Sequence, residues 1–218
     1  MLKLVIFDFD GVIFNSVKYY LKTRAFYFKK YGVKFTKKDK KDNLATTTKD
    51  FVMYVNKKYN LNVSYKQYVK GKKEIFNSFL PKIKPNLGII RLLKELKKNK
   101  IKIALSSSNN KKIVLFLLNK YKLTGYFDLI LGLENIKKYK PNPEAYLKPS
   151  KLLKINPFNC VGIEDALQGV ISINSANMKS VGVLSEFTTL SDFKKINTDL
   201  IIKSMNDLNY KKIALLCK

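Results

Sequence analysis

Two aspartates stand close together near the start of the chain, Asp8 and Asp10, at the end of an apolar run that has the composition of a buried strand. A carboxylate in a dry site is costly unless a cation, a proton or hydrogen-bond donors compensate for its charge. The pair therefore requires a cation, a proton or a strong set of hydrogen-bond donors close by. The stretch LVIFDFDGVIFNS therefore predicts positively charged partners elsewhere in the sequence.

Other polar residues follow later apolar runs in the same way. Ser106–Ser108 and Asn109 offer hydroxyl and amide donors, Lys140 offers a positive charge, and Glu164 with Asp165 forms a second acidic pair. Ligands of open α/β sheets bind beyond the carboxyl ends of the strands, so a sheet would bring all four segments to one edge. Such a cluster has the groups that a divalent cation and a phosphate require.

The elements that would position these groups are short apolar runs alternating with helical patterns. Apolar runs of this kind indicate parallel strands covered on both faces, and their alternation with helices predicts a doubly wound α/β sheet with a Rossmann-like core. The helices expected in this core include Gly88–Lys98 and Lys111–Tyr121. The expected strands are Leu2–Phe7, Ile101–Leu105, Leu129–Leu131, Cys160–Ile163, Ser180–Leu184 and Leu200–Ile202.

One interval lacks strands and contains only amphipathic helical patterns. These are YYLKTRAFYFKKYGV, KDFVMYVNKKYNL and SYKQYVKGKKEIFNSFL. We therefore expect an all-helical cap domain at 17–82, inserted into an α/β core formed by 1–16 and 83–218. Within the core, Pro149 is expected to kink or restart its helix, and Asn177 to end a helix in the left-handed conformation.

Composition excludes several classes of function. The chain has no histidine, which removes Ser-His-Asp and Cys-His systems and histidine-ligated zinc. Its net charge of +27 comes almost wholly from lysine, and Arg24 and Arg91 are the only arginines, which disfavours a dedicated nucleic-acid reader. No long apolar run or basic leader is present, and the two cysteines match no metal or redox spacing, so a cytoplasmic protein without a membrane span is expected.

Four motifs, DFDGVIFNS, LSSSN, KPNPEAY and GIEDALQGV, occur in the order and spacing found in the haloacid dehalogenase superfamily, which the chain resembles along essentially its whole length. It resembles most the capped phosphatase and phosphomutase branch. The resemblance implies that Asp8 is the nucleophile, that Asp10 is the general acid/base, and that Lys140 neutralises Asp8 and the phosphate. Asp10 favours phosphoryl transfer, because dehalogenases of the group lack this second aspartate.

The same resemblance implies a bound Mg²⁺. Its ligands would be Asp8, the carbonyl group of Asp10, and Asp165, with Glu164 bound directly or through water. Magnesium prefers six oxygen ligands and retains several waters, so this number of carboxylates is sufficient.

The substrate contacts implied by the resemblance come from two segments. Ser107 would donate to the phosphoryl oxygens, with Ser108 and Asn109 beside it. In the cap, the residues TTTK at 46–49 replace an arginine-bearing specificity loop, and Thr47 is expected to contact substrate.

The leading hypothesis is a Mg²⁺-dependent phosphatase of small phosphorylated metabolites, working through an aspartyl-phosphate as a monomer or weak dimer. A sugar-phosphate phosphomutase using the same site is an alternative, although Tyr20 stands where similar mutases have a histidine. A third reading is a nucleic-acid-associated protein or polynucleotide phosphatase, in which the basic surface is functional.

Overall fold

The computed structural model describes residues 1–43 and 47–218 and divides the chain into two compact units, one of Met1–Asn15 with Lys84–Lys218 and one of Ser16–Ile83. The second unit extends one residue beyond the expected 17–82 at each end. The segments through which the chain leaves and re-enters the first unit are hydrogen-bonded to each other. The Asn15 N–H donates to Lys84 O (3.1 Å). Asn86 N–H likewise donates to Ile13 O (2.9 Å).

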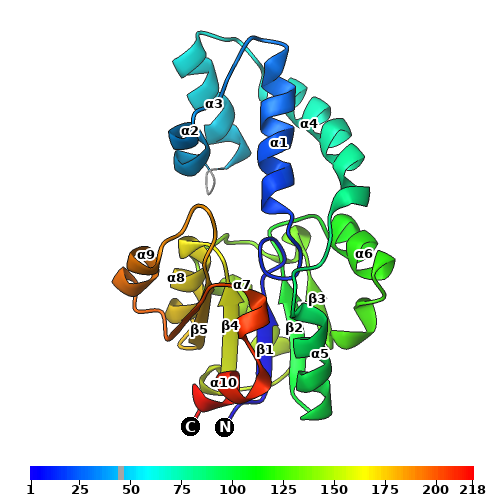
Figure 1. The fold of residues 1–218 in the computed structure, drawn as a ribbon, viewed down its shortest axis with the longest axis vertical. Coiled ribbons are helices and arrows are strands. Elements are labelled where there is room, and N and C mark those ends of the chain that lie inside the picture. Colours follow the sequence, from blue (N-terminus) through cyan, green and yellow to red (C-terminus); the bar gives the residue numbers. More distant parts are fainter. Residues whose placement is uncertain (44–46) are drawn as a thin grey trace. The chain divides into compact units, whose positions relative to one another are not determined.

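The first unit is built on a six-stranded parallel sheet with the strand order β3-β2-β1-β4-β5-β6 (Figure 1). This order confirms the predicted doubly wound fold, and the direction of winding reverses between β1 and β4. The observed ends differ from the expected ones by up to two residues, because pairing with neighbours sets them. The strands are β1 (Leu4–Phe7), β2 (Lys102–Ser106), β3 (Leu129–Leu131), β4 (Cys160–Glu164), β5 (Lys179–Val183) and β6 (Leu200–Ile202).

Helices pack against this sheet and bury its apolar side chains. Leu4 and Ile6 of β1 share one core with Tyr146 and Ile173, which lie on α7 and α8. Because side chains alternate along a strand, Val5 and Phe7 face the other layer. The helices are α5 (Ile89–Lys98), α6 (Lys111–Lys120), α7 (Glu144–Leu152), α8 (Leu167–Ser175), α9 (Leu190–Lys195) and α10 (Tyr210–Leu215).

Two local expectations have different outcomes. Helix α7 continues through Pro149, so the predicted restart is wrong, while the alternative of a kink stays a prediction. Proline removes only its own N–H, and the Pro149 carbonyl still accepts the N–H of Leu153 (3.0 Å). The expectation for Asn177 is confirmed, because this residue follows α8 with a φ of 55°.

The second unit consists of the helices α1 (Val17–Lys29), α2 (Lys37–Asp42), α3 (Thr48–Tyr59) and α4 (Tyr65–Phe79). Its core is rich in aromatic side chains, among them Phe28, Phe51 and Tyr68. Helix α2, with the sequence KKDKKD, has no apolar stripe and is not among the helices predicted from periodicity. In the part of the chain that the structure describes, no helix combines the length and apolarity needed to cross a membrane.

Candidate active site

Asp8 and Glu164 lie side by side because they end neighbouring strands. Phe7 of β1 pairs with Ile163 of β4, and the Asp8 N–H extends this ladder by donating to Ile163 O (3.0 Å). Both acids are buried. They stand at the carboxyl edge of the sheet where the winding reverses, which is the ligand-binding position in folds of this type.

Lys140 joins these two carboxylates. Its Nζ donates to Asp8 Oδ1 (2.6 Å) and also forms an ion pair with Glu164 Oε1. The segment between Lys140 and α7 is tied to α8, since Ser172 Oγ donates to Asn142 O (2.6 Å). A largely shielded ammonium is thereby placed between two buried acids.

Asp165 completes a group of three carboxylates. One oxygen each from Asp8, Glu164 and Asp165 lies within 4.8 Å of the others. Gly11 makes this possible, because it has a φ of 74° and a Cβ there would lie 1.9 Å from Asp165 Oδ2. An all-carboxylate donor set of hard oxygens fits Mg²⁺.

The Asp10 side chain turns elsewhere, and its carboxylate is not part of this group of three. Asp10 Oδ2 accepts a hydrogen bond from Asn109 Nδ2, so the structure brings these two predicted residues together. The turn that starts here is held by Gly11 N–H donating to Phe14 O (2.8 Å) and by Asn86 Nδ2 donating to Gly11 O (2.7 Å). A metal contact through the Asp10 carbonyl group stays a prediction.

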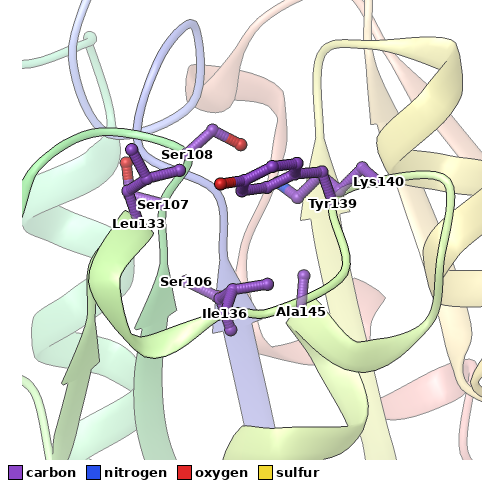
Figure 2. Close-up of a pocket in the computed structure, with 8 residues that line it drawn as sticks. All are labelled: Ser106, Ser107, Ser108, Leu133, Ile136, Tyr139, Lys140 and Ala145. Atoms are coloured by element: carbon purple, nitrogen blue, oxygen red, sulfur yellow. The ribbon is translucent and has the colours of Figure 1, made fainter.

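The serines after β2 form a compact loop. Ser107 Oγ accepts the N–H of Asn109 (3.0 Å), and a hydroxyl that accepts from its own loop keeps its hydrogen for another partner. Figure 2 shows the Tyr139 ring reaching from beside Lys140 toward Ser107 and Ser108. The cavity there measures about 10 Å³, which suits one water rather than a phosphate. It is lined by Ser106, Ser107, Ser108, Leu133, Ile136, Tyr139, Lys140 and Ala145.

The site carries more negative charge than Lys140 can balance. Burial, followed by repulsion from Glu164, raises the pKa of Asp8 to about 8 even though Lys140 opposes the shift. Burial, Glu164 and Asp8 also raise the pKa of Asp165 far above its usual range. Burial lowers the pKa of Lys140, but Asp8 and Glu164 outweigh it and hold that pKa above its ordinary value. A bound cation would relieve this imbalance.

Comparison with known proteins identifies the family of the chain. A family model described as haloacid dehalogenase-like hydrolase matches residues 5–183. The chain belongs to this family. It is 29% identical over 219 residues to a beta-phosphoglucomutase of Bacillus subtilis, covering 95% of this chain and 92% of that protein. It is 26% identical over 219 residues to a phosphorylated carbohydrates phosphatase of Thermotoga maritima, covering 98% and 100%.

The fold of this haloacid dehalogenase-like protein also matches a solved relative. A beta-phosphoglucomutase from Clostridium difficile superposes with a TM-score of 0.84 at 32% identity, covering 100% of this chain and 97% of that one. These similarities confirm the superfamily resemblance that the four motifs indicated.

Tyr146 is a contact of this site that the sequence analysis missed. Its hydroxyl donates to Glu164 Oε1 (2.9 Å), and burial, followed by the charge of Glu164, raises its pKa well above the usual range. Glu164 Oε2 accepts the N–H groups of Asp165 (3.1 Å) and Ala166 (3.3 Å). Tyr146 lies in the quoted motif KPNPEAY, where an aromatic residue at helical spacing is typical of a core position.

Glu134 is a second missed residue. Its carboxylate accepts the Lys111 N–H at the start of α6 (3.1 Å to Oε2), so this N–H is engaged by the protein itself.

Thr47 is the N-cap residue of a helix in the second unit. It caps α3 by accepting the Asp50 N–H (3.1 Å), and its hydroxyl donates to Asp50 Oδ2 (2.7 Å). Its substrate contact stays a prediction, and the neighbouring Thr46 lies outside the described residues.

Proposed function

We propose that the protein is a Mg²⁺-dependent phosphatase of small phosphorylated metabolites. The observation that carries this proposal is Lys140 held between the buried acids Asp8 and Glu164, with Asp165 beside them, at the strand edge where ligands bind. Relatives named as phosphatases support it, including the phosphorylated carbohydrates phosphatase.

In the first half of the proposed reaction, an Asp8 carboxylate oxygen attacks phosphorus and forms an aspartyl-phosphate. The bond from phosphorus to the ester oxygen breaks, and that oxygen takes a proton from Asp10. Asn109 holds the Asp10 carboxyl group in place for this transfer. Lys140 and the Ser107 hydroxyl bind the phosphoryl oxygens.

In the second half, the ionised Asp10 removes a proton from a water molecule as its oxygen attacks phosphorus. The bond between phosphorus and Asp8 breaks, inorganic phosphate leaves, and both aspartates return to their starting states. Asp8, Asp165, Glu164 and the Asp10 carbonyl would hold Mg²⁺, which supplies positive charge to the transferring phosphoryl group.

Replacing the nucleophile is the direct test. Phosphate release from a panel of phosphomonoesters with Mg²⁺ should fall by about 1,000-fold or more in Asp8→Asn, because no covalent step remains. Asp207→Asn is the matched control, since Asp207 is exposed and its carboxylate accepts the local N–H of Ser204. Full activity in Asp8→Asn would falsify the mechanism.

A phosphomutase is the second candidate, favoured by the similarity to two proteins named beta-phosphoglucomutase. Tyr20, at the position where similar mutases have a histidine, stacks on Phe76 with ring centroids 4.4 Å apart. Interconversion of sugar 1- and 6-phosphates, primed with a sugar bisphosphate, distinguishes the two activities. Isomerisation faster than phosphate release would favour the mutase.

A further inference from the structure

Tyr139 is an aromatic residue at the site that the proposed mechanism does not use. It directly precedes Lys140, and its side chain lines the same small cavity as Ser107, Ser108 and Lys140. Figure 2 shows its hydroxyl directed toward the two serines. The residue is nevertheless 58% exposed, so its ring forms part of the boundary between this cavity and solvent.

The backbone around Tyr139 is anchored, although the ring is exposed. Tyr139 O accepts the Asn142 N–H (2.9 Å). The Glu144 carboxylate accepts the N–H groups of Lys137 (3.0 Å) and Lys138 (2.8 Å), which come just before Tyr139. The protein therefore sets the position of this residue before a ligand binds, and only its side-chain torsions remain to be fixed on binding.

A phosphoryl group bound beside Asp8 needs several hydrogen-bond donors, because its charge is spread over three equatorial oxygens. Lys140 has three N–H donors, and it already directs two of them at Asp8 and Glu164. The Ser107 hydroxyl can supply one more donor. These side chains alone leave part of the acceptor capacity of a phosphoryl group unmatched.

Two other strong donors of the α/β unit are occupied by the protein itself. The unit has one arginine, Arg91, whose Nη2 donates to Asn206 O (2.7 Å) and Leu208 O (3.1 Å). The Lys111 N–H at the start of α6 donates to the Glu134 carboxylate (3.1 Å to Oε2).

The Tyr139 hydroxyl is a donor without such an engagement. In the α/β unit, all of whose residues the structure describes, no protein group forms a hydrogen bond with it. A hydroxyl that donates to an anionic oxygen forms one of the stronger hydrogen bonds of proteins. The cavity that the ring lines is too small for a phosphate, at about 10 Å³, so a phosphoryl group has to bind outside it.

We propose that the Tyr139 hydroxyl is a further substrate-binding group of this site and donates to an oxygen of the phosphoryl group. The inference rests on the proposed function for the class of substrate, a phosphate ester. Ser107, after β2, and Tyr139, before α7, then hold the same phosphoryl group from two segments of the chain. Inorganic phosphate carries the same oxygens, so the contact should form with it as well.

Binding of inorganic phosphate tests this contact without turnover. The full-length protein, in the presence of Mg²⁺, is titrated with inorganic phosphate, and the backbone amide resonances of Ser107 and Ser108 are followed in ¹H–¹⁵N spectra. These resonances report on phosphate at the serine loop rather than on phosphate held by distant surface lysines. We expect Tyr139→Phe to weaken this affinity by about tenfold, because one charge-assisted hydrogen bond is lost.

Tyr126→Phe is the matched control, because it removes the same hydroxyl at the opposite edge of the sheet. Tyr126 precedes β3, whereas the Ser107 N–H donates to the carbonyl group of Leu131, the last residue of that strand. Both variants keep the aromatic ring, and circular dichroism checks that both are folded. Equal phosphate affinities in the two variants would overturn the proposal, as would the absence of a saturable shift in the wild type.

Turnover of p-nitrophenyl phosphate separates this contact from one with the leaving group. Tyr139→Phe should raise KM with a smaller effect on kcat, because the hydrogen bond already exists in the bound ground state. A raised KM combined with unchanged affinity for inorganic phosphate would assign the hydroxyl to the leaving group and overturn the proposal. A wild type that does not turn over, but whose phosphate affinity depends on Tyr139, would refute the phosphatase and retain this binding role.

Discussion

Glu164 receives hydrogen bonds on both carboxylate oxygens before any ligand binds. Lys140 and Tyr146 donate to Oε1, and the N–H groups of Asp165 and Ala166 donate to Oε2. This arrangement fixes the orientation of the carboxylate and, through it, the position of Lys140. Tyr146 touches no reacting atom in the proposed mechanism, so we regard it as a positioning residue.

Removing the Tyr146 hydroxyl should therefore weaken Mg²⁺ binding, while the remaining aromatic ring still fills its place in the core. We expect Tyr146→Phe to raise the Mg²⁺ concentration needed for half-maximal activity by about tenfold, the scale of losses for groups that orient metal ligands. Tyr126→Phe, before β3 and away from the strand edge, should leave the Mg²⁺ requirement unchanged. An unaltered requirement in Tyr146→Phe, with activity lost only through unfolding, would contradict this role.

Gly11 allows a second test at the residue scale. In Gly11→Ala the new methyl group would overlap Asp165 Oδ2, so we expect Mg²⁺-dependent activity to fall by about 100-fold or more. Gly32→Ala is matched in backbone strain, because Gly32 has a φ of 75° but no atom within 4 Å of the added Cβ. Both variants should lose about 1–2 kcal/mol of stability in thermal unfolding, and only Gly11→Ala should lose activity.

Among the elements, α2 is held by one buried acid rather than by an apolar face. Asp39 accepts the N–H and the hydroxyl of Thr36 (both 2.8 Å) and the hydroxyl of Tyr59 (3.0 Å). Tyr54 and Lys58 also donate to it. Burial raises the pKa of Asp39, but the hydrogen bonds from Lys58, Tyr54 and Thr36 outweigh it and hold that pKa below its usual range.

Asp39→Asn should destabilise the protein by about 2 kcal/mol at neutral pH, because the amide has no charge and only one acceptor oxygen for these donors. A carboxyl group with a lowered pKa stabilises the fold above the pKa of the unfolded chain, near 4, and this stabilisation is lost as pH falls through the folded value. The stability difference between wild type and Asp39→Asn should therefore shrink as pH falls from about 5 towards 2.

Urea unfolding at several pH values measures this difference. Asp50→Asn provides the control, because Asp50 is exposed on α3 and pairs only locally with Thr47. A stability difference that widened on acidification would show that Asp39 is not the stabilising anion.

The elements that carry the chemistry were predictable because their signal is local. Apolar runs ending in Asp8, in the serines or in Glu164 mark the strand ends, and parallel pairing then brings them to one edge. The acid that holds α2 was not predictable, because Asp39 in KKDKKD has the spacing of a solvated charge run. Its donors Thr36, Tyr54 and Tyr59 become neighbours only after the helices pack. The contact of Tyr146 with Glu164 escaped notice for the same reason.

At the scale of the whole molecule, the site gathers acidic groups although the chain as a whole is strongly positive. The chain has 43 lysines and arginines against 16 acids, yet three acids gather at one point. Because the pKa of Asp8 is raised to about 8, protons would compete with the proposed Mg²⁺ for this carboxylate. The affinity for Mg²⁺ should therefore increase as pH rises from about 6 to 8.5, with protons released on binding.

Calorimetry in buffers of different ionisation enthalpy measures both the affinity and the released protons. Mg²⁺ should also raise the unfolding temperature of the wild type. Asp165→Asn, which removes one of the three carboxylates, should abolish that increase. A Mg²⁺ affinity that did not change with pH would show that Asp8 is not a ligand of the metal.

The paired backbone at Asn15–Lys84 and Ile13–Asn86 has an evolutionary consequence. The inserted segment leaves and returns through adjacent positions, so in topological terms it is one long surface loop of the sheet. Closing such a loop costs only slightly more when it lengthens. An insert joined in this way can change in length during evolution at little cost to the stability of the sheet.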